Sequence, residues 1–125
     1  MTTIINLTPH EINIDLGGNR LAFPPSGQIA RVSVKNIPEG EIMLDDVNGI
    51  PVSKPVYGVV EGLPTPYVDD TDGSRSVQPG VIYIVSMLVA QRCPGRDDIV
   101  VPDSGPSAIR GANGQIEAVR GFIRY

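Results

Sequence analysis

Serine and arginine residues recur beside glycine-rich turns along this chain, and together they have the chemistry of an anion site. Backbone N–H groups exposed in glycine turns, or at the start of a helix, attract phosphate or carboxylate groups. Arginine adds planar, bidentate contacts to the same groups. The residues in this pattern are Ser26, Arg31, Ser86, Arg96, Ser104 and Arg110. If the fold gathers their turns on one rim, they form a pocket for a phosphate-bearing small molecule.

Two kinds of ring side chain could complete such a pocket. Tyr57 or Tyr67 would stack on a nucleotide base, because aromatic faces bind bases of any sequence. His10 is the one histidine of the chain, and it would contact a phosphate or a ring edge. The alternative reading makes His10 a turn residue bonded to backbone. A zinc site is not expected, since zinc needs three or four nitrogen or sulfur ligands.

Three carboxylates bracket the apolar segment Ile99–Val101, and they raise the question of catalysis. Asp97, Asp98 and Asp103 could hold Mg²⁺ or act as an acid and base pair, as in a small metal-dependent hydrolase. We favour the alternative that they cap turns. Ser104 beside His10 lacks a third, orienting group, and no P-loop, dinucleotide or Gly-x-Ser-x-Gly motif occurs. The sequence therefore predicts a protein that is not an enzyme and has no cofactor or metal.

The composition limits the binding partners and the cellular compartment that we expect for this protein. A net charge of −4 argues against nucleic-acid binding, which needs a basic surface. Cys93 is the only cysteine, so nothing implies an oxidising compartment. The N-terminus has no basic and apolar leader, and no apolar run reaches membrane-spanning length. We expect a cytoplasmic protein that binds no membrane.

The elements that would position these residues are short strands. Fourteen glycines and twelve prolines separate short aliphatic runs in a chain of 125 residues, which favours one β-rich domain. The expected strands are 3–7, 11–16, 20–23, 28–35, 41–47, 50–57, 81–85, 99–101 and 115–124. Ser86 begins a short helix at about 86–92, which Pro94-Gly95 ends.

Turns and loops occupy the intervals between these strands. Asn48-Gly49 is the strongest hairpin signal. Pro51 and Pro55 make the strand that follows it an edge strand or irregular. Ile37–Gly40 is expected to be a turn, and 59–66 an ordered loop. The polar stretch at about 67–78 is expected to be a mobile loop. The fold class is thus α+β, with a twisted, mostly antiparallel sheet and one short helix.

Five segments together resemble a family of small proteins carried by bacteriophages, prophages and many bacteria. The segments are Asn6–His10, Pro24–Val32, Val56–Pro64, Tyr83–Ala90 and Pro102–Pro106. The resemblance spans nearly the whole chain, and only the connection at 67–78 is longer than the pattern. Small phage proteins of this size include oligomeric sponges that sequester cyclic nucleotide signals of bacterial antiviral immunity, of the anti-CBASS or anti-Thoeris type. The resemblance implies such a role in the cytoplasm of an infected or lysogenic host.

Two main hypotheses of function follow. In the first, the chain binds and sequesters a nucleotide-like anion without hydrolysing it. In the second, it is a virion, assembly or host-protein-binding interaction module. Homo-oligomers are expected in the first case, because short strands leave sheet edges that pair with other chains.

Overall fold

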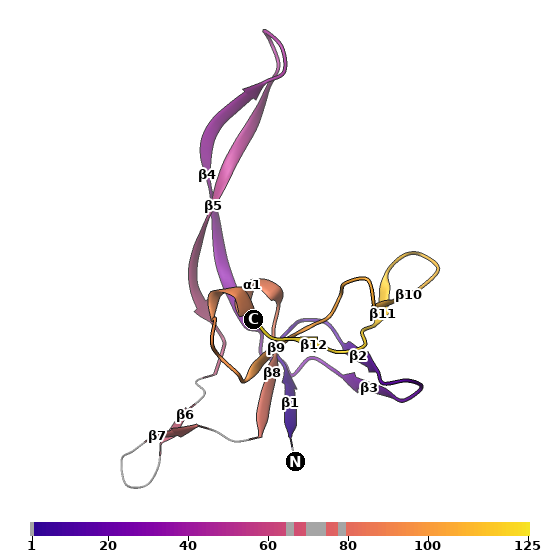
Figure 1. Ribbon diagram of the computed structural model, residues 1–125. Helices are drawn as coiled ribbons and strands as arrows, with labels where there is room; N and C mark the ends of the chain where they lie inside the picture. Colours follow the sequence, from indigo (N-terminus) through magenta and orange to yellow (C-terminus); the bar gives the residue numbers. More distant parts are fainter. Residues whose placement is uncertain (1, 65–66, 70–74, 78–79) are drawn as a thin grey trace.

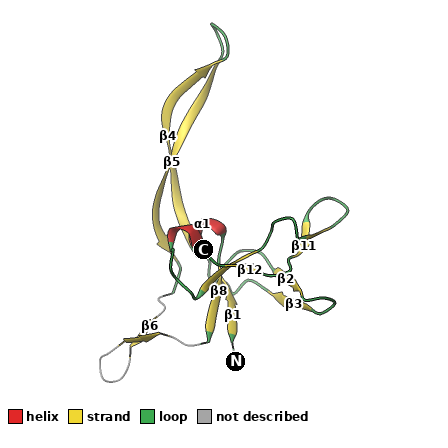
Figure 2. Cartoon of the chain, in the orientation of Figure 1, coloured by secondary structure: helices red, strands yellow, loops and turns green. Residues whose placement is uncertain are grey.

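The computed structural model of the protein describes residues 2–64, 67–69, 75–77 and 80–125 (Figures 1 and 2). Its elements are β1 (Thr3–Asn6), β2 (Ile12–Asp15), β3 (Arg20–Phe23), β4 (Arg31–Met43), β5 (Gly49–Glu61), β6 (Tyr67–Asp69), β7 (Arg75–Val77), β8 (Val81–Ile84), α1 (Met87–Arg92), β9 (Ile99–Pro102), β10 (Ile109–Arg110), β11 (Ile116–Ala118) and β12 (Phe122–Ile123). The predicted class, β-rich α+β with one short helix and mostly antiparallel pairing, is confirmed for these residues.

A four-stranded sheet in the order β1-β8-β9-β12 forms the centre of the molecule. Strands β1, β8 and β9 run parallel, and β12 pairs antiparallel with β9. The continuous apolar runs of β8 and β9 are typical of strands buried on both faces, which is the usual state of parallel strands. Apolar periodicity reports burial and not direction, so the sequence analysis did not anticipate the parallel pairs.

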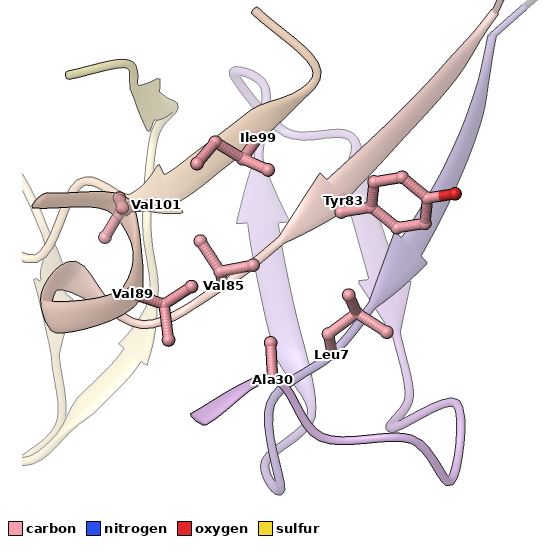
Figure 3. Close-up of a cluster of buried hydrophobic side chains, with 8 residues drawn as sticks. Leu7, Ala30, Tyr83, Val85, Val89, Ile99 and Val101 are labelled. Carbon is pink, nitrogen blue, oxygen red and sulfur yellow. The ribbon is translucent and has the colours of Figure 1, made fainter. Parts of the chain in front are cut away.

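The main hydrophobic cluster covers one face of this sheet (Figure 3). Tyr83 in β8 and Val85, directly after it, alternate onto this face, and Ile99 and Val101 do so from β9. Helix α1 contributes Val89 and Ala90, and the chain before β4 contributes Ala30. Leu7, directly after β1, is fully buried here. Ile84 and Val100 are also buried, on the opposite face of the sheet.

Helix α1 is short because both of its ends are specified by sequence. Ser86 has extended backbone angles (φ −71°, ψ 159°), and its hydroxyl accepts a 3.4 Å hydrogen bond from the N–H of Val89. Pro94 prevents the helix from continuing. Both predictions are confirmed. No helix in the described ranges is long and apolar enough to cross a bilayer.

The longest element is the hairpin of β4 and β5, which projects far beyond the rest of the molecule (Figure 1). We call it the arm, residues 31–61. The hairpin at Asn48-Gly49 is confirmed, but its tip has five residues rather than two, because Asp45 accepts hydrogen bonds from the N–H groups of Val47 and Asn48.

Within the arm, two sequence predictions are wrong. The expected turn at 37–40 is instead the middle of β4, and the expected loop at 59–66 is strand as far as Glu61. A bulge accommodates the first deviation: Pro38 pairs with Ser53 and Gly40 with Val52, so Glu39 is the extra residue. Gly40 has a φ of +113°, which other residues rarely adopt. The bulge therefore keeps the strand continuous through residues that usually end one.

Near the C-terminus, the expected strand at 115–124 is split in two. Strand β11 pairs with β10, whereas β12 pairs with β9 in the central sheet. Between them Val119 leaves the hairpin and bridges to Ile14, with its N–H donating to the carbonyl of Asn13. The expected mobile loop at about 67–78 includes the pairing strands β6 and β7, and its remaining residues lie outside the described part.

Removing buried volume at Leu7 will destabilise the protein. Leu7→Ala is expected to lower the free energy of unfolding by about 3 kcal/mol, because a cavity remains in the cluster of α1 and the sheet. Leu16→Ala is the matched control, since Leu16 is 54% exposed, and it should change stability by less than about 0.5 kcal/mol. Urea unfolding followed by circular dichroism measures both. Equal effects would show that Leu7 does not anchor this core.

Candidate functional site

The carboxyl ends of the three parallel strands lie at one edge of the central sheet. Asn6 is level with Ile84 in the register of β1 and β8, and Ile84 is level with Val100 in that of β8 and β9. The segments that leave the strands at this edge begin with Leu7, Val85 and Asp103. We call it the carboxyl edge. In sheets with parallel strands, ligands bind at such an edge.

Five of the predicted site residues belong to segments at the carboxyl edge. The N–H of Ser26 donates to the carbonyl of Asn6, and the N–H of Ala30, directly before Arg31, donates to the carbonyl of Leu7. These bonds attach the loop before β4 to the end of β1. The five residues are His10, Ser26, Arg31, Ser86 and Ser104. These residues therefore lie on segments at one end of the sheet, and their role in binding stays a prediction.

A buried polar network underlies this edge. Asn6 is 2% exposed, and its amide nitrogen donates to the carbonyls of His10 (2.7 Å) and Phe23 (2.9 Å). Its amide oxygen accepts from the N–H (2.9 Å) and the hydroxyl (2.7 Å) of Thr8. One side chain therefore satisfies four groups and joins the turn after β1 to the end of β3. His10 itself is exposed, and it contributes to the network through its backbone carbonyl.

Arg96 lies at the opposite end of the sheet, before β9 begins. Its guanidinium makes two bonds to the Asp98 carboxylate, at 2.9 Å from Nε and 2.6 Å from Nη2. Nη2 also donates to the carbonyl of Pro64. Hydrogen bonding to Asp98 raises the pKa of Arg96, against the opposing effect of partial burial. Arg96 thus holds the loop after β5 against the start of β9, and its charge is matched by a carboxylate.

The side chains of Arg110 and Tyr57 are engaged in contacts of their own. Arg110 is in the β10–β11 hairpin, where Nη1 donates to the carbonyl of Gly114 at 2.9 Å. Tyr57 is near the base of the arm, and the guanidinium of Arg92 covers its ring at 3.9 Å from the centroid. This cation–π contact fastens α1 to β5. Arg96 is thus held at the amino end of β9, away from the carboxyl edge. Arg110 pairs in register with Ile116, which lines the same pocket as Ser104, but its guanidinium is bonded within its own hairpin. Tyr67, the other stacking candidate, is in β6, and its side chain lies outside the described part.

A surface pocket of about 240 Å³ opens between β2, β11 and the end of β9. Its lining includes Ser104 and the aliphatic side chains of Ile12 and Ile116. Glu11 and Glu117 also line it, so negative charge surrounds the cavity. Coulomb repulsion between these carboxylates and a phosphate would weaken binding of the predicted anion at this position.

Two of the three aspartates considered for catalysis, Asp98 and Asp103, hold an ion pair and a turn. Asp98 pairs with Arg96, and Asp103 accepts from the N–H of Gly105 at 3.2 Å and from the hydroxyl of Ser107 at 3.3 Å. No three potential ligands among His, Cys, Asp and Glu come together in the described ranges. This geometry gives the hypothesis of a metal-dependent hydrolase no support.

The second candidate surface is one face of the arm. The register places Ile37, Ile42, Ile50, Val52 and Val56 on the same face, because directly paired residues and alternate residues along β5 share a face. We call this the aliphatic face. Lys35 and Lys54 belong to it as well. Ile37, Ile42, Ile50 and Val56 are each 45–61% exposed, so nothing in the described chain covers them.

The contacts that hold the arm on the body fall at its base. Val32 and Val60 pack against the core cluster. Arg92 stacks on Tyr57, and α1 packs on β4. The distal part of the arm therefore stands in solvent (Figure 1).

The tip of the arm is acidic, and its base is basic. Asp45 and Asp46 are in the tip, whereas Arg31, Lys35 and Lys54 are in the half nearer the body. Hydrogen bonds from the side chain of Asn48 and from the N–H groups of Val47 and Asn48 hold the pKa of Asp45 below its ordinary value of 3.8. The tip is thus negative at neutral pH.

The sequence analysis missed two parts of this picture. Asn6 carried a signal, because Asn followed two residues later by Thr is typical of an Asx turn. The aliphatic face also carried one, since Ile50, Val52 and Val56 alternate with other residues along β5. The three prolines and Gly40 hid this pattern, because they normally end strands.

Comparisons with protein-family models, curated proteins and solved structures find no match to this chain.

Loss of the Asn6 side chain will destabilise the protein more than loss of an exposed asparagine side chain. Asn6→Ala leaves the carbonyl of Phe23 and the N–H of Thr8 without the partners they have now, whereas the Thr8 hydroxyl can still donate to the carbonyl of His10 at 3.1 Å. Two unpaired groups in a buried region should lower the free energy of unfolding by about 3 kcal/mol. Asn13→Ala is the matched control, because its amide makes one exposed bond of 3.4 Å to the carbonyl of Glu117. Chemical denaturation of both variants measures the difference. A loss below about 1 kcal/mol for Asn6→Ala would contradict the role of the network.

Proposed function

We propose that this protein is a non-catalytic interaction module, and that the arm is the element with which it joins a larger protein assembly. The observation that carries the proposal is the aliphatic face, on which Ile37, Ile42, Ile50 and Val56 are all 45–61% exposed. Soluble monomers rarely expose a contiguous apolar patch of this kind, and such patches mark protein contacts.

The stability of the arm leads to the same conclusion. An isolated two-stranded hairpin is marginally stable in water, and it becomes stable when one face packs on another surface. Each strand of the arm has 13 residues, but only the base contacts the body. A partner that covers the aliphatic face would supply the missing burial, at about 25 cal/mol for each Å² of apolar surface.

Site-specific photo-crosslinking in expressing cells tests this role. A photoreactive phenylalanine analogue at position 42 lies on the aliphatic face, whereas the same analogue at the adjacent Met43 lies on the opposite face. We expect position 42 to give a covalent protein adduct of one defined mass, and position 43 to give about tenfold less. Equal labelling from both positions, or none from either, would show that this face binds no protein.

A second candidate function is sequestration of a nucleotide-like ligand at the carboxyl edge. It is favoured by the five predicted residues that reach this edge, His10, Ser26, Arg31, Ser86 and Ser104, and by the general use of such edges for ligand binding. This is the role implied by the resemblance to phage-borne proteins. Weighing against it are Glu11 and Glu117 at the pocket beside Ser104, and the engagement of Arg96 by Asp98.

A thermal-shift panel of cyclic dinucleotides, cyclic trinucleotides and ADP-ribose derivatives tests this candidate. A ligand at one hundred times its Kd adds about 2.7 kcal/mol and should raise the Tm by about 10 °C. Arg31→Ala should abolish the rise. Arg110→Ala should not, because its guanidinium bonds within its own hairpin. A flat panel, or loss of the shift with Arg110→Ala alone, would exclude a site at this edge.

A further inference from the structure

We infer that the partner of the aliphatic face is the same face of a second copy of this chain, with the two arms packed antiparallel about a two-fold axis. The inference rests on the proposed role of the arm as an interaction element, and it adds the identity and orientation of the partner. Three observations on the arm carry it: its blocked edges, its distribution of charge, and a glycine at the middle of its face.

Prolines interrupt both edges of the arm and disfavour strand addition. Proline has no N–H, so it fits a paired strand only where its nitrogen points away from the partner strand. Pro51 and Pro55 remove outward donors on β5, and Pro38 does the same on β4. A third strand would find interrupted donors on both sides. Association through the arm therefore uses its face rather than its edges.

The charges of the arm match those of an antiparallel copy. Lys35 and Lys54 flank the aliphatic face in the half nearer the body, and Asp45 and Asp46 form the tip. None of the ion pairs between described residues includes these two lysines. Placing two arms antiparallel sets each acidic tip beside Lys35 of the other chain. Lys54 is level with Ile37, two residues nearer the middle of the arm. A parallel arrangement would set lysine against lysine and aspartate against aspartate, which disfavours it.

The middle of the aliphatic face permits close approach. The antiparallel arrangement sets the tip of each arm beside the base of the other. Its two-fold axis passes near the pair Gly40–Val52, because Gly40 is midway between Lys35 and Asp45 in the chain. Gly40 has no side chain there, and no atom lies within 4 Å of where a Cβ would stand. The isoleucines on either side can then interdigitate over arms about 44 Å long. Because the same patch serves on both chains, the contact is isologous and closes at two copies.

Analytical ultracentrifugation of the purified full-length chain is the first test. We expect a dimer, and we expect Ile42→Lys to raise the dimer Kd at least about a hundredfold, because it places a charge in an apolar interface at the level of Lys54 of the second copy. Met43→Lys, on the opposite face, is the matched control and should keep the dimer. Circular dichroism should show both variants folded, since the arm residues that pack against the core cluster, Val32 and Val60, lie at its base. A monomeric wild type, or a dimeric Ile42→Lys, overturns the inference.

A charge exchange then tests the orientation. Lys35→Glu alone and Asp46→Lys alone should each weaken the dimer by about tenfold. Asp46 is chosen because Asp45 holds the turn through its hydrogen bonds. A mixture of the two variants should recover affinity in the heterodimer, where the glutamate introduced at position 35 of one chain would meet the lysine introduced at position 46 of the other. A mixture no tighter than either variant alone overturns the antiparallel arrangement.

These outcomes separate this inference from the proposed function. If the purified chain is monomeric while position 42 crosslinks in cells to a protein of different mass, the second copy is wrong and the interaction module stands. If the chain neither self-associates nor crosslinks, both are wrong.

Discussion

Parallel pairing of β1 with β8 is the constraint on which the rest of the structure depends. It joins segments far apart in the sequence, because Asn6 is level with Ile84. The chain from β2 to β7, including the arm, thus forms one long connection between two adjacent strands of the sheet. Closing such a loop costs entropy that grows slowly with length, so a long arm can be inserted at little further cost. The buried cluster around Leu7 and Val85 offsets that cost.

The same pairing creates the carboxyl edge and anchors the arm beside it. Asn6 ends β1 and carries the polar network, and the backbone bond from Ala30 to Leu7 fixes the start of β4 next to that strand end. Ser86 then begins α1 at the same edge, and α1 in turn packs on the base of the arm through Arg92 and Tyr57. These contacts therefore hold the base of the arm against the body, although its distal part is surrounded by solvent. Such a base allows a long element to present its face in a fixed direction.

The exposed apolar side chains of the arm and the prolines that interrupt its edges occupy different positions. The prolines sit at paired positions whose nitrogens point outward, which limits uncontrolled strand addition. The three isoleucines, with Val52 and Val56, sit on one face, where a matching surface can satisfy their packing. Val34 and Met43 are exposed on the opposite face. A hairpin that was both long and open at its edges would invite aggregation. The arm thus exposes apolar side chains on one face while prolines interrupt its edges. This arrangement is the physical reason for interpreting the arm as an interaction element.

The sequence by itself determined the local elements. Alternation located β2, Asn48-Gly49 located the hairpin, and Ser86 with Pro94 delimited α1, because each depends on the conformational preferences of a few adjacent residues. Only the tertiary structure decided which strands pair and in which direction. It placed the guanidinium of Arg96 on Asp98, and that of Arg110 on the carbonyl of Gly114 in its own hairpin. It also carried β4 through Pro38 and Gly40 by a bulge. These outcomes depend on contacts between residues far apart in the chain, which local propensity does not encode.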